Sequence, residues 1–451
     1  MLAAAQSSPW PAPAVTHPIH ATVRIPGSKS MTNRALILAA LAASPSTIEG
    51  ALLARDSQLA ITALRQLGAD VAVSGTTVYM APLAVSGSKA GAGQGAGSAT
   101  FTHVTDDSSV TAIDCGLAGT VMRFLPPVAA LTEQTVRLDG DPRARLRPLA
   151  PLTAALRTLG VQVSGDHLPI TIRGTGAVVG GAATLDSSTS SQFVSGLLLA
   201  AARFEQGVRV THHGPALPSL PHIQMTVAML AERGVRVESQ DDNLTHCHWR
   251  VVPGPIAGGT FSVEPDLSNA GPFLAAAMVT GGTVRIPGWP RHTWQAGDAL
   301  REIFAAMGAQ VVVDHDGLTL IGPVTPHGID QDFSAVGELV PTVAAVAALA
   351  DGPSRLRGIG HLRGHETDRL AALGRELQAF GCQAEVFPDS LAITPGPLQP
   401  GVVECYADHR MATFGAIIGL RVPGTHLSDV SCTTKTLPDF AELWTAMVTG
   451  G

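Results

Sequence analysis

The segment 26–34, PGSKSMTNR, places Lys29 and Arg34 among hydroxyl and amide residues directly before an apolar run. Only three of the chain's 29 basic residues are lysines, so arginine is its usual cation. A lysine kept at position 29 indicates a need for a compact, flexible ammonium. The hydroxyl residues are typical of a helix N-terminus, where free N–H groups and the positive dipole end attract anions. The segment therefore predicts a phosphate site; the alternative is an ordinary capped helix with two surface charges, and the Walker A spacing is absent.

Further polar segments recur along the chain, each rich in arginine, hydroxyl groups, histidine or carboxylates. They are the segments 114–123, 141–148, 187–193, 363–370, 408–412 and 433–439. Taken singly, each is compatible with a loop, a helix cap or a surface ion-pair cluster. Their regular recurrence favours one site shared between domains. A metal site is disfavoured, because His365 and Glu366 are adjacent and neither HExxH nor a paired Cys/His spacing occurs.

The elements that must position these segments follow from an internal repeat. A helical stretch, a glycine and then alternating apolar positions recur with glycine spacings of 92, 74, 74 and 73. The glycines are Gly68, Gly160, Gly234, Gly308 and Gly381. Each is predicted to cap a helix C-terminus and lead into a strand. The glycine-rich stretch 86–99, a predicted surface loop, explains the longer first spacing.

A second pattern, a small residue followed by a strand and usually a glycine, has six copies. They lie at 46–50, 135–140, 207–210, 282–288, 354–358 and 424–427. We therefore expect six copies of one unit that mixes strands and helices. Such units are longer than those of solenoids and are better packed as two domains of three units each.

Bulk composition limits the possible functions. The 451 residues are 45% hydrophobic and carry a net charge of −7, so large cores are expected and nucleic acid is an unlikely partner. No run of 18 apolar residues predicts a membrane span, and residues 1–20 lack the basic start of a signal peptide. Five scattered cysteines without CxxC indicate reduced thiols, so we expect a cytoplasmic protein.

Seven motifs together resemble the 5-enolpyruvylshikimate-3-phosphate synthase family of the enolpyruvyl transferase superfamily. PGSKSxxNRAL, GxAGTxxR, RxRP, SSQF, HETDRL, DHRMA and TKTLPD occur in the family's order from near residue 20 to near residue 440. The resemblance implies an α/β (α+β) fold of two similar domains. Each would hold three repeated strand-helix units in an inside-out α/β barrel, and a double-crossover hinge would join them. The implied first domain is 28–264, and the second comprises 1–27 and 265–451.

The resemblance also implies the reaction. The family transfers the enolpyruvyl group of phosphoenolpyruvate to the 5-hydroxyl of shikimate 3-phosphate and releases phosphate. The reaction passes through a tetrahedral intermediate at the sixth step of the shikimate pathway to chorismate and aromatic amino acids. The enzyme is the target of glyphosate. No metal or organic cofactor is implied, the only partners are the two small-molecule substrates, and a monomer is expected.

The motif positions imply which residues bind and react. Those expected around phosphoenolpyruvate are Lys29, Gly119, Arg147, Gln192, Arg369, Arg410 and Lys435. Those expected around shikimate 3-phosphate are Lys29, Ser30, Arg34, Ser190, Ser191, Gln192, Ser219, Glu338 and His365. Glu366 and Glu338, close to Lys29 and His409, are the expected catalytic groups; which carboxylate is the acid and which the base stays open.

This chain departs from the family pattern at several of these positions. Leu117 replaces an asparagine in the glycine-rich turn, and Glu338 replaces a shorter aspartate. His222, His361 and His365 stand where tyrosine, asparagine and lysine are common. For His365 we expect the charge of Glu366 and of bound phosphate to outweigh burial and keep the imidazole protonated.

Two other functions remain as alternatives. UDP-N-acetylglucosamine enolpyruvyl transferase has the same fold and would use a loop cysteine, for which Cys115 is the candidate. Its position inside the glycine-rich turn, together with SSQF and HETDRL, favours the shikimate branch. A non-enzymatic phosphometabolite-binding protein is the other alternative, but binding alone would not need Glu366, Lys29 and His409 together.

Overall fold

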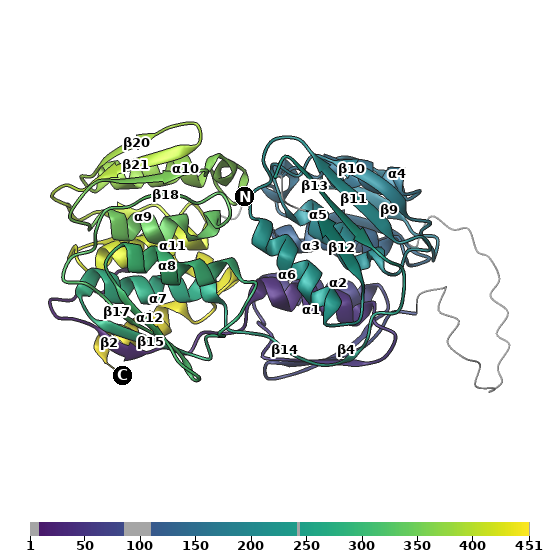
Figure 1. Ribbon diagram of the computed structural model, residues 1–451, viewed down its shortest axis with the longest axis horizontal. Coiled ribbons are helices and arrows are strands. Elements are labelled where there is room, and N and C mark those ends of the chain that lie inside the picture. The colour runs from purple at the N-terminus through teal and green to yellow at the C-terminus, as the bar shows by residue number, and fades with distance from the viewer. Residues whose placement is uncertain (1–8, 85–109, 241–243, 451) are drawn as a thin grey trace, which may run out of the picture.

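A computed structural model describes residues 9–84, 110–240 and 244–450; the glycine-rich stretch predicted at 86–99 lies outside them. The chain forms two lobes that lie side by side (Figure 1). Each lobe has its own apolar core. The core of the first lobe runs from Ala35 to Ile256, and that of the second combines residues 12–25 with residues 267–447. The predicted α/β class with two similar halves is confirmed.

Six sheets repeat one design, which confirms the six predicted units. In each sheet two neighbouring strands are parallel and the following strands are antiparallel. The sheets of the first lobe are β14-β3-β5-β4, β6-β7-β9-β8 and β10-β11-β13-β12, and those of the second are β2-β15-β17-β16, β18-β19-β21-β20 and β22-β23-β1. Buried residues of a parallel pair can lie opposite one another. Ile113, for example, is paired with Leu138.

The strands are short, as expected for units of this length. Those of the first lobe are β3 (Ser46–Glu49), β4 (Asp70–Ser74), β5 (Thr77–Ala81), β6 (Val110–Asp114), β7 (Thr135–Asp139), β8 (Gln162–Ser164), β9 (Ile170–Arg173), β10 (Gly181–Leu185), β11 (Val208–His213), β12 (Val237–Gln240), β13 (His246–Val251) and β14 (Gly259–Ser262). Those of the second lobe are β1 (Trp10–Pro11), β2 (His20–Thr22), β15 (Thr283–Pro287), β16 (Gln310–Val313), β17 (Gly317–Ile321), β18 (Asp330–Asp332), β19 (Ser354–Arg357), β20 (Gln383–Val386), β21 (Ser390–Thr394), β22 (Val402–Val403) and β23 (His426–Leu427).

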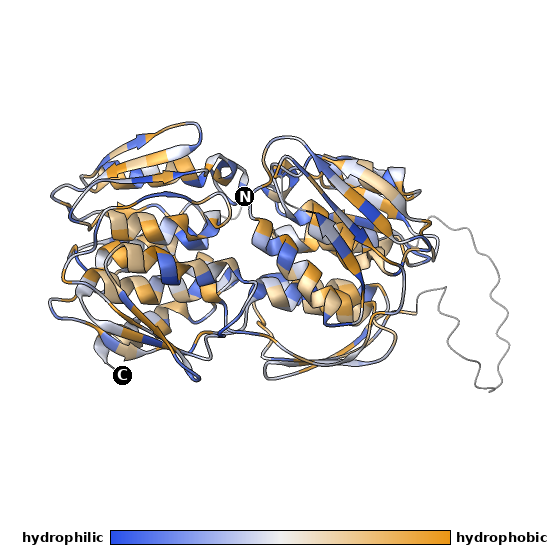
Figure 2. Cartoon of the chain, in the orientation of Figure 1, coloured by the Kyte–Doolittle hydropathy of each residue, from blue (hydrophilic) through white to orange (hydrophobic). Residues whose placement is uncertain are grey.

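Each unit also contributes a central helix and an outer helix. The central helices are α1 (Lys29–Ala40), α3 (Gly119–Ala129), α5 (Gln192–Ala201), α7 (Leu267–Thr280), α9 (Val340–Ala347) and α11 (His409–Gly419). They pack against one another inside each lobe, and α3 and α9 are buried all round. The outer helices are α2 (Arg55–Gln66), α4 (Ala150–Thr158), α6 (Leu220–Ala231), α8 (Leu300–Ala306), α10 (Arg369–Ala379) and α12 (Phe440–Thr449). Figure 2 shows hydrophobic residues on both the helices and the strands of the two lobes.

Short 3-10 helices connect several of these elements. They are η1 (Ala144–Leu146), η2 (Ala296–Ala299), η3 (Gly337–Leu339), η4 (Gly360–Gly364) and η5 (Val430–Lys435). Among the residues described, no helix is long and apolar enough to cross a membrane.

The five predicted capping glycines all follow outer helices with positive φ. The angles run from 75° at Gly234 to 108° at Gly68, which is the left-handed conformation that glycine adopts without strain. The structure adds a sixth cap, Gly450, with φ 74° after α12. The sequence pattern, which paired each glycine with a following strand, did not identify it.

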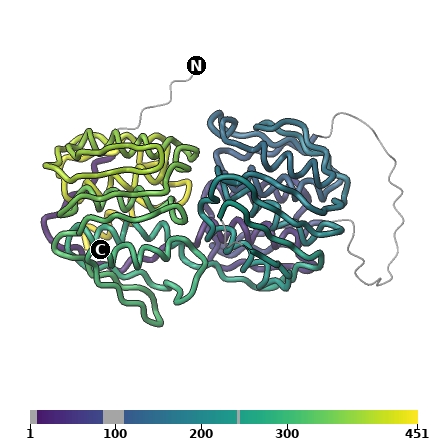
Figure 3. Tube along the Cα trace, turned by 45° about the horizontal axis from the view of Figure 1, so that its top comes forward, coloured from purple at the N-terminus to yellow at the C-terminus, as the bar shows by residue number. Residues whose placement is uncertain are grey.

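The chain crosses between the lobes twice. Figure 3 shows its purple start threading the second lobe before it enters the first. In the second lobe, β1 pairs with β23 as an edge strand of its sheet. In the first lobe, β14 pairs with β3 as an edge strand of its sheet. The two crossings meet at a bridge between Gly27 and Pro265. The domain boundaries stay a prediction: 28–264 for the first domain, and 1–27 with 265–451 for the second. The position of the two crossings supports them.

The close contact at the crossing gives a test of the hinge. A Cβ added at Gly27 would lie 1.9 Å from the carbonyl oxygen of Gly50, a backbone atom that cannot swing aside. We expect Gly27→Ala to cost roughly 1–3 kcal/mol of stability, seen as a lower calorimetric Tm. Gly254→Ala, where nothing lies within 4 Å, is the matched control. Equal Tm values for the two variants would show that the crossing tolerates a side chain.

Candidate active site

A pocket lies where the N-termini of all six central helices converge from both lobes. Its lining includes residues at the start of these helices or directly before it. They are Ser28 and Lys29 of α1, Gly119 of α3, Gln192 of α5, Asp266 and Ser268 of α7, Glu338 just before α9, and His409 of α11. Helix N-termini carry free N–H groups and partial positive charge, so their convergence favours an anionic ligand.

The side chains of the pocket are predominantly cationic. Its lining contains six basic residues: Lys29, Arg34, Arg147, Arg369, Arg410 and Lys435. It contains four acidic residues: Asp56, Asp266, Glu338 and Glu366. The local excess of positive charge sits in a chain whose net charge is −7. The pocket therefore suits small molecules with several negative charges.

Lys29 stands at the junction of the two lobes. Its ammonium lies 3.4 Å from Asp56, and its backbone N–H donates to Asp266 at 3.0 Å. Asp266 is also the N-cap of α7, accepting from the N–H of Asn269 at 2.9 Å. One carboxylate thus ties the starts of α1 and α7 together. Burial lowers the pKa of Lys29, and nearby Lys435 lowers it further.

Glu366 is held between two cations. Its oxygens lie 2.6 Å from Lys435 and 2.8 Å from Arg369. Arg369 also donates twice to Asp408, at 2.8 and 3.1 Å, and Asp408 caps α11 through the N–H of Arg410. Burial raises the pKa of Glu366, but Lys435 and Arg369 more than reverse this and hold it well below its ordinary value. Glu366 is therefore an anion at neutral pH.

Glu338 is the second carboxylate of the pocket. It lies 3.2 Å from Nε2 of His222, which belongs to α6 in the first lobe. Burial raises the pKa of Glu338, but His222 outweighs it and the net pKa is about 2. Beside this pair, the N–H of Ser219 donates to the carbonyl of Ser334 at 3.0 Å. Both contacts join the first lobe to the second next to the pocket.

Burial lowers the pKa of two histidines of the pocket, His365 and His409. Burial lowers the pKa of His365 well below its ordinary value, Arg369 lowers it further, and Glu366 only partly opposes them. Its Nδ1 lies 3.4 Å from a donor nitrogen of Arg369, as a neutral imidazole allows. In the protein alone the imidazolium of His365 is therefore disfavoured, and its protonation with phosphate bound stays a prediction. Burial likewise lowers the pKa of His409, whose Nδ1 is buried without a hydrogen-bond partner.

Gly119, in the glycine-rich turn, lies against Arg147 of the segment 141–148. A Cβ there would lie 2.9 Å from guanidinium nitrogens of both Arg123 and Arg147, so a side chain at this position would have to displace them. Arg123 donates to the side-chain oxygen of Gln192 at 3.1 Å, which leaves the amide nitrogen to donate elsewhere. Arg147 donates to the backbone carbonyl of Leu117 at 3.2 Å, a contact that does not depend on the side chain at position 117.

Arg34 is buried without a carboxylate partner. Its guanidinium donates to Thr226 at 2.7 Å, to the carbonyls of Ser30 and His222 at 2.9 Å and to Ser195 at 3.3 Å. These bonds tie α1 to α5 and α6. Burial lowers its pKa to about 9. Most of its donors are thus engaged within the protein, while its positive charge still lacks a partner of opposite sign.

The structure brings most of the predicted site residues together. Those that line the pocket are Lys29, Ser30, Arg34, Gly119, Arg147, Gln192, Glu338, His365, Glu366, Arg369, His409, Arg410 and Lys435. Ser190, Ser191 and Ser219 do not line it; they lie just before α5 and α6. Four further residues line the pocket and were not predicted from the sequence: Asp56, Asp266, Asn269 and Gln295. An Asp at a helix start was the available signal for Asp266.

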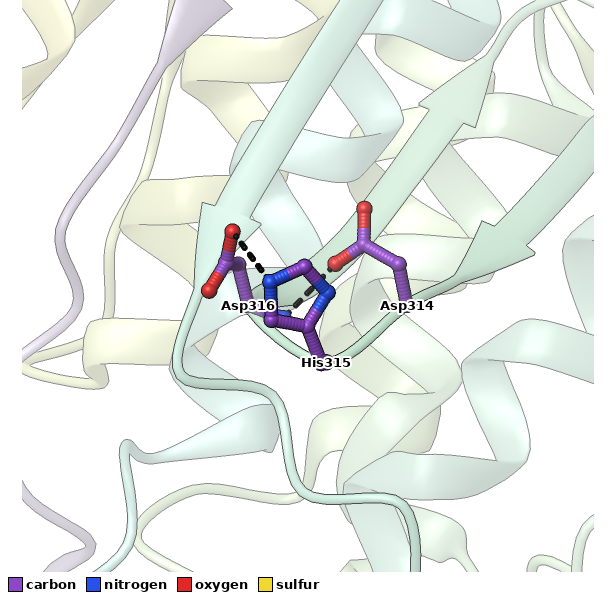
Figure 4. A group of neighbouring side chains, drawn as sticks. All are labelled: Asp314, His315 and Asp316. Atoms are coloured by element: carbon purple, nitrogen blue, oxygen red, sulfur yellow. Dashed lines mark hydrogen bonds and ion pairs between the residues drawn. The ribbon is translucent and has the colours of Figure 1, made fainter.

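One group in the described residues has the composition of a metal site. Asp314, His315 and Asp316 lie close together at an exposed turn between β16 and β17 (Figure 4). The carboxylate of Asp314 already accepts from Arg285 at 2.9 Å and from the N–H groups of Asp316 and Gly317. None of the three lines the pocket. This group therefore closes a hairpin, and we assign it no role in catalysis.

Two lobes of three units each meet at this basic pocket. Two solved structures of EPSP synthase from Acinetobacter baumannii share the fold. They are each 23% identical to this chain, with TM-scores of 0.78 and 0.76 and coverage of 98% and 97% of both chains, respectively. The family model described as EPSP synthase (3-phosphoshikimate 1-carboxyvinyltransferase) matches residues 14–444.

The chain therefore belongs to the EPSP synthase family. Its activity is the transfer of the enolpyruvyl group of phosphoenolpyruvate to the 5-hydroxyl of shikimate 3-phosphate, with release of phosphate. This reaction belongs to the shikimate pathway to aromatic amino acids.

The depressed pKa of Glu338 predicts a pH-dependent contribution to stability. Because its folded pKa is about 2, against an ordinary 4.5, the stabilisation is complete above pH 4.5 and is lost as the pH falls towards 2. Between about pH 5 and about pH 3 the wild type should lose about 2 kcal/mol more than Glu338→Gln. Calorimetric Tm values at both pH values check this, with the exposed Glu442→Gln as control. Parallel pH curves for the wild type and Glu338→Gln would contradict the assignment.

Proposed function

We propose that the pocket binds both substrates together and that its charged residues carry out the transfer. Phosphoenolpyruvate would bind among Lys29, Gly119, Arg147, Gln192, Arg369, Arg410 and Lys435. Shikimate 3-phosphate would bind among Ser30, Arg34, Ser190, Ser191, Ser219, Glu338 and His365, with Lys29 and Gln192 facing both. The convergence of cations and helix N-termini from both lobes on one pocket carries this proposal.

The reaction consists of an addition followed by an elimination. The 5-hydroxyl oxygen attacks C2 of phosphoenolpyruvate and loses its proton to a base, while C3 takes up a proton and becomes a methyl group. The tetrahedral intermediate then returns a proton from C3 to the former acid, and the C2–O bond to phosphate breaks as the leaving phosphate takes the proton held by the base. One acid and one base suffice, since each regains its starting state in the second step.

The surroundings of the two carboxylates suit them to different roles. Glu338 is an anion whose nearest partner is His222, so it can accept the hydroxyl proton. Glu366 must first gain a proton before it can donate one. The anionic groups of phosphoenolpyruvate would neutralise Lys435 and Arg369, which weakens their hold on Glu366 and raises its pKa. Glu366 is thus the acid of the addition step once phosphoenolpyruvate is bound.

We further propose that the protein acts as a monomer in the cytoplasm. A single chain supplies residues from both lobes to the pocket, so completing the site needs no second copy. None of the five cysteines, all within the described residues, forms a disulfide, which suits a reducing compartment. Light scattering of the purified protein measures the oligomeric state directly.

Phosphate release tests the proposed function. We expect phosphate only when phosphoenolpyruvate and shikimate 3-phosphate are present together, with one enolpyruvyl group added to the acceptor by mass spectrometry. UDP-N-acetylglucosamine in place of shikimate 3-phosphate should give none. Release with the nucleotide sugar would favour the other transferase, and binding without release would favour a binding protein.

A conservative substitution tests the role of Lys29. Its ammonium is buried beside Asp56 and Lys435, where a broader guanidinium fork cannot take the same place. We expect Lys29→Arg to fold with an unchanged Tm and to lose at least about 10²-fold in kcat. Arg55→Lys, at an exposed ion pair outside the pocket lining, is the control. Near-normal turnover of Lys29→Arg would defeat the assignment.

The neutral His365 predicts proton uptake on binding. A phosphate dianion beside it would favour the imidazolium, so shikimate 3-phosphate should bind together with a proton near neutral pH. Affinity should then weaken as the pH rises through the higher pKa of the complex. Titration calorimetry in buffers of different ionisation enthalpy measures the protons taken up. The His365→Lys variant, whose lysine is already charged, should take up fewer protons. Equal proton uptake by both proteins would show that His365 does not bind the proton.

A further inference from the structure

A loop of the second lobe lies directly on the start of α7, beside the pocket. Gln295 stands in this loop, just before η2, and lines the pocket although only 6% of the residue is exposed. Two residues further on, a Cβ at Gly297 would lie 2.5 Å from backbone atoms of both Leu267 and Ser268. The loop backbone is therefore packed against the first turn of α7, residues 267–270.

The side-chain amide of Gln295 has hydrogen bonds at both its oxygen and its nitrogen. The oxygen accepts from the N–H of Leu267 at 3.2 Å. The nitrogen donates to the carboxylate of Glu264 at 2.8 Å and to the carbonyl of Pro265 at 2.9 Å. The reverse orientation of the amide would place its oxygen against two acceptors, so these partners fix it. They lie on both sides of Asp266 in the chain, and Gln295 thus holds the backbone that carries this carboxylate.

Thr293 supports the same arrangement from outside the pocket. Its hydroxyl accepts from the N–H of Gln295 at 3.1 Å and donates to Glu264 at 2.5 Å. Thr293 is not part of the pocket lining. Thr293 and Gln295 together attach the second crossing, residues 264–266, to the loop that precedes η2.

The first turn of α7 and its N-cap in turn hold three segments that carry cations of the pocket. The contacts are the N–H of Lys29 with Asp266 at 3.0 Å, a guanidinium nitrogen of Arg410 with the carbonyl of Ser268 at 2.7 Å, and the side-chain amide of Asn269 with the carbonyl of Thr436, next to Lys435, at 3.0 Å. A shift of this turn would therefore move the cations that come from both lobes.

We propose that Gln295 is a positioning residue for the transfer, because it holds the start of α7 where Lys29, Arg410 and Lys435 together face phosphoenolpyruvate. The inference rests on the proposed assignment of phosphoenolpyruvate to these cations. Glutamine suits the position, since a neutral amide supplies one acceptor and two donors. A leucine would leave the N–H of Leu267 without this partner, and a carboxylate would repel Glu264.

The kinetic signature separates the two substrates. Gln295→Leu keeps a side chain of similar size and removes the three hydrogen bonds. We expect its KM for phosphoenolpyruvate to rise and its kcat to fall, each by about tenfold or more, because displacements of about 1 Å in an active site have such effects. The Kd of shikimate 3-phosphate alone, measured by titration calorimetry, should stay that of the wild type, since most of its proposed ligands lie in the first lobe.

Gln399→Leu is the matched control. Gln399 is exposed, lies outside the pocket lining and makes one long side-chain bond, of 3.5 Å, to the carbonyl of Pro397. This variant should keep the wild-type kcat and both KM values. Unchanged kinetics in Gln295→Leu as well would overturn the proposal, whereas a wild type that releases no phosphate from the two substrates would overturn the proposed function itself.

Thr293→Val distinguishes positioning from direct contact with the substrate. Because Thr293 does not line the pocket, its loss can act only through the loop and Glu264. We expect the same direction as in Gln295→Leu, with a higher KM for phosphoenolpyruvate and a lower kcat, but a smaller effect. Wild-type kinetics in Thr293→Val together with an impaired Gln295→Leu would mean that Gln295 contacts the substrate itself, which would overturn the positioning role.

Gln295→Glu tests the hydrogen bonds themselves and decides if Gln295→Leu fails to fold. Repulsion from Glu264 and Asp266 raises the pKa of the new carboxyl, although Lys29 opposes them. Once protonated, this carboxyl can again donate to Glu264 and accept from the N–H of Leu267. The ratio of its kcat to that of the wild type should therefore rise as the pH falls from about 8 to about 6. A ratio that stays constant over this range would overturn the proposal.

Discussion

Like charges brought together in one pocket are the constraint on which the rest of this structure depends. The N-termini of six helices and six cationic side chains face a common space, and their mutual repulsion must be offset. Carboxylates that lie between the cations offset part of this repulsion. Asp266 joins the starts of α1 and α7, Asp408 caps α11 and holds Arg369, and Glu366 separates Arg369 from Lys435. The remaining positive charge matches substrates that each carry a phosphate and a carboxylate.

This constraint explains the repeated architecture. In every unit the central helix is buried along its length and begins at the pocket, while the outer helix and sheet cover it. The sequence revealed this unit through its capping glycines, because positive φ at a helix end leaves a local signature. It did not reveal that β1 and β14 complete the units at the two crossings. Strand pairing over such distances depends on the packed lobes and not on local pattern.

Most of the site was predictable where a motif carried it, although Ser190 and Ser191 of SSQF do not line the pocket. Lys29, Arg147, Glu366 and Lys435 stood in recognisable segments, and all line the pocket. Asp56 was not identified because a single acidic residue near a helix start resembles an ordinary cap. For His365 the charged neighbours are visible in the sequence, but the burial that lowers its pKa in the protein alone is not.

The central claim is that helix N-termini from both lobes hold the substrates together. A crystal structure of the protein with shikimate 3-phosphate and glyphosate tests it most directly. We predict that the anionic groups lie against the starts of α1 and α5 from the first lobe and of α7 and α11 from the second, with Lys29 and Lys435 in contact. Ligands bound by the residues of one lobe alone, or outside this pocket, would contradict the claim.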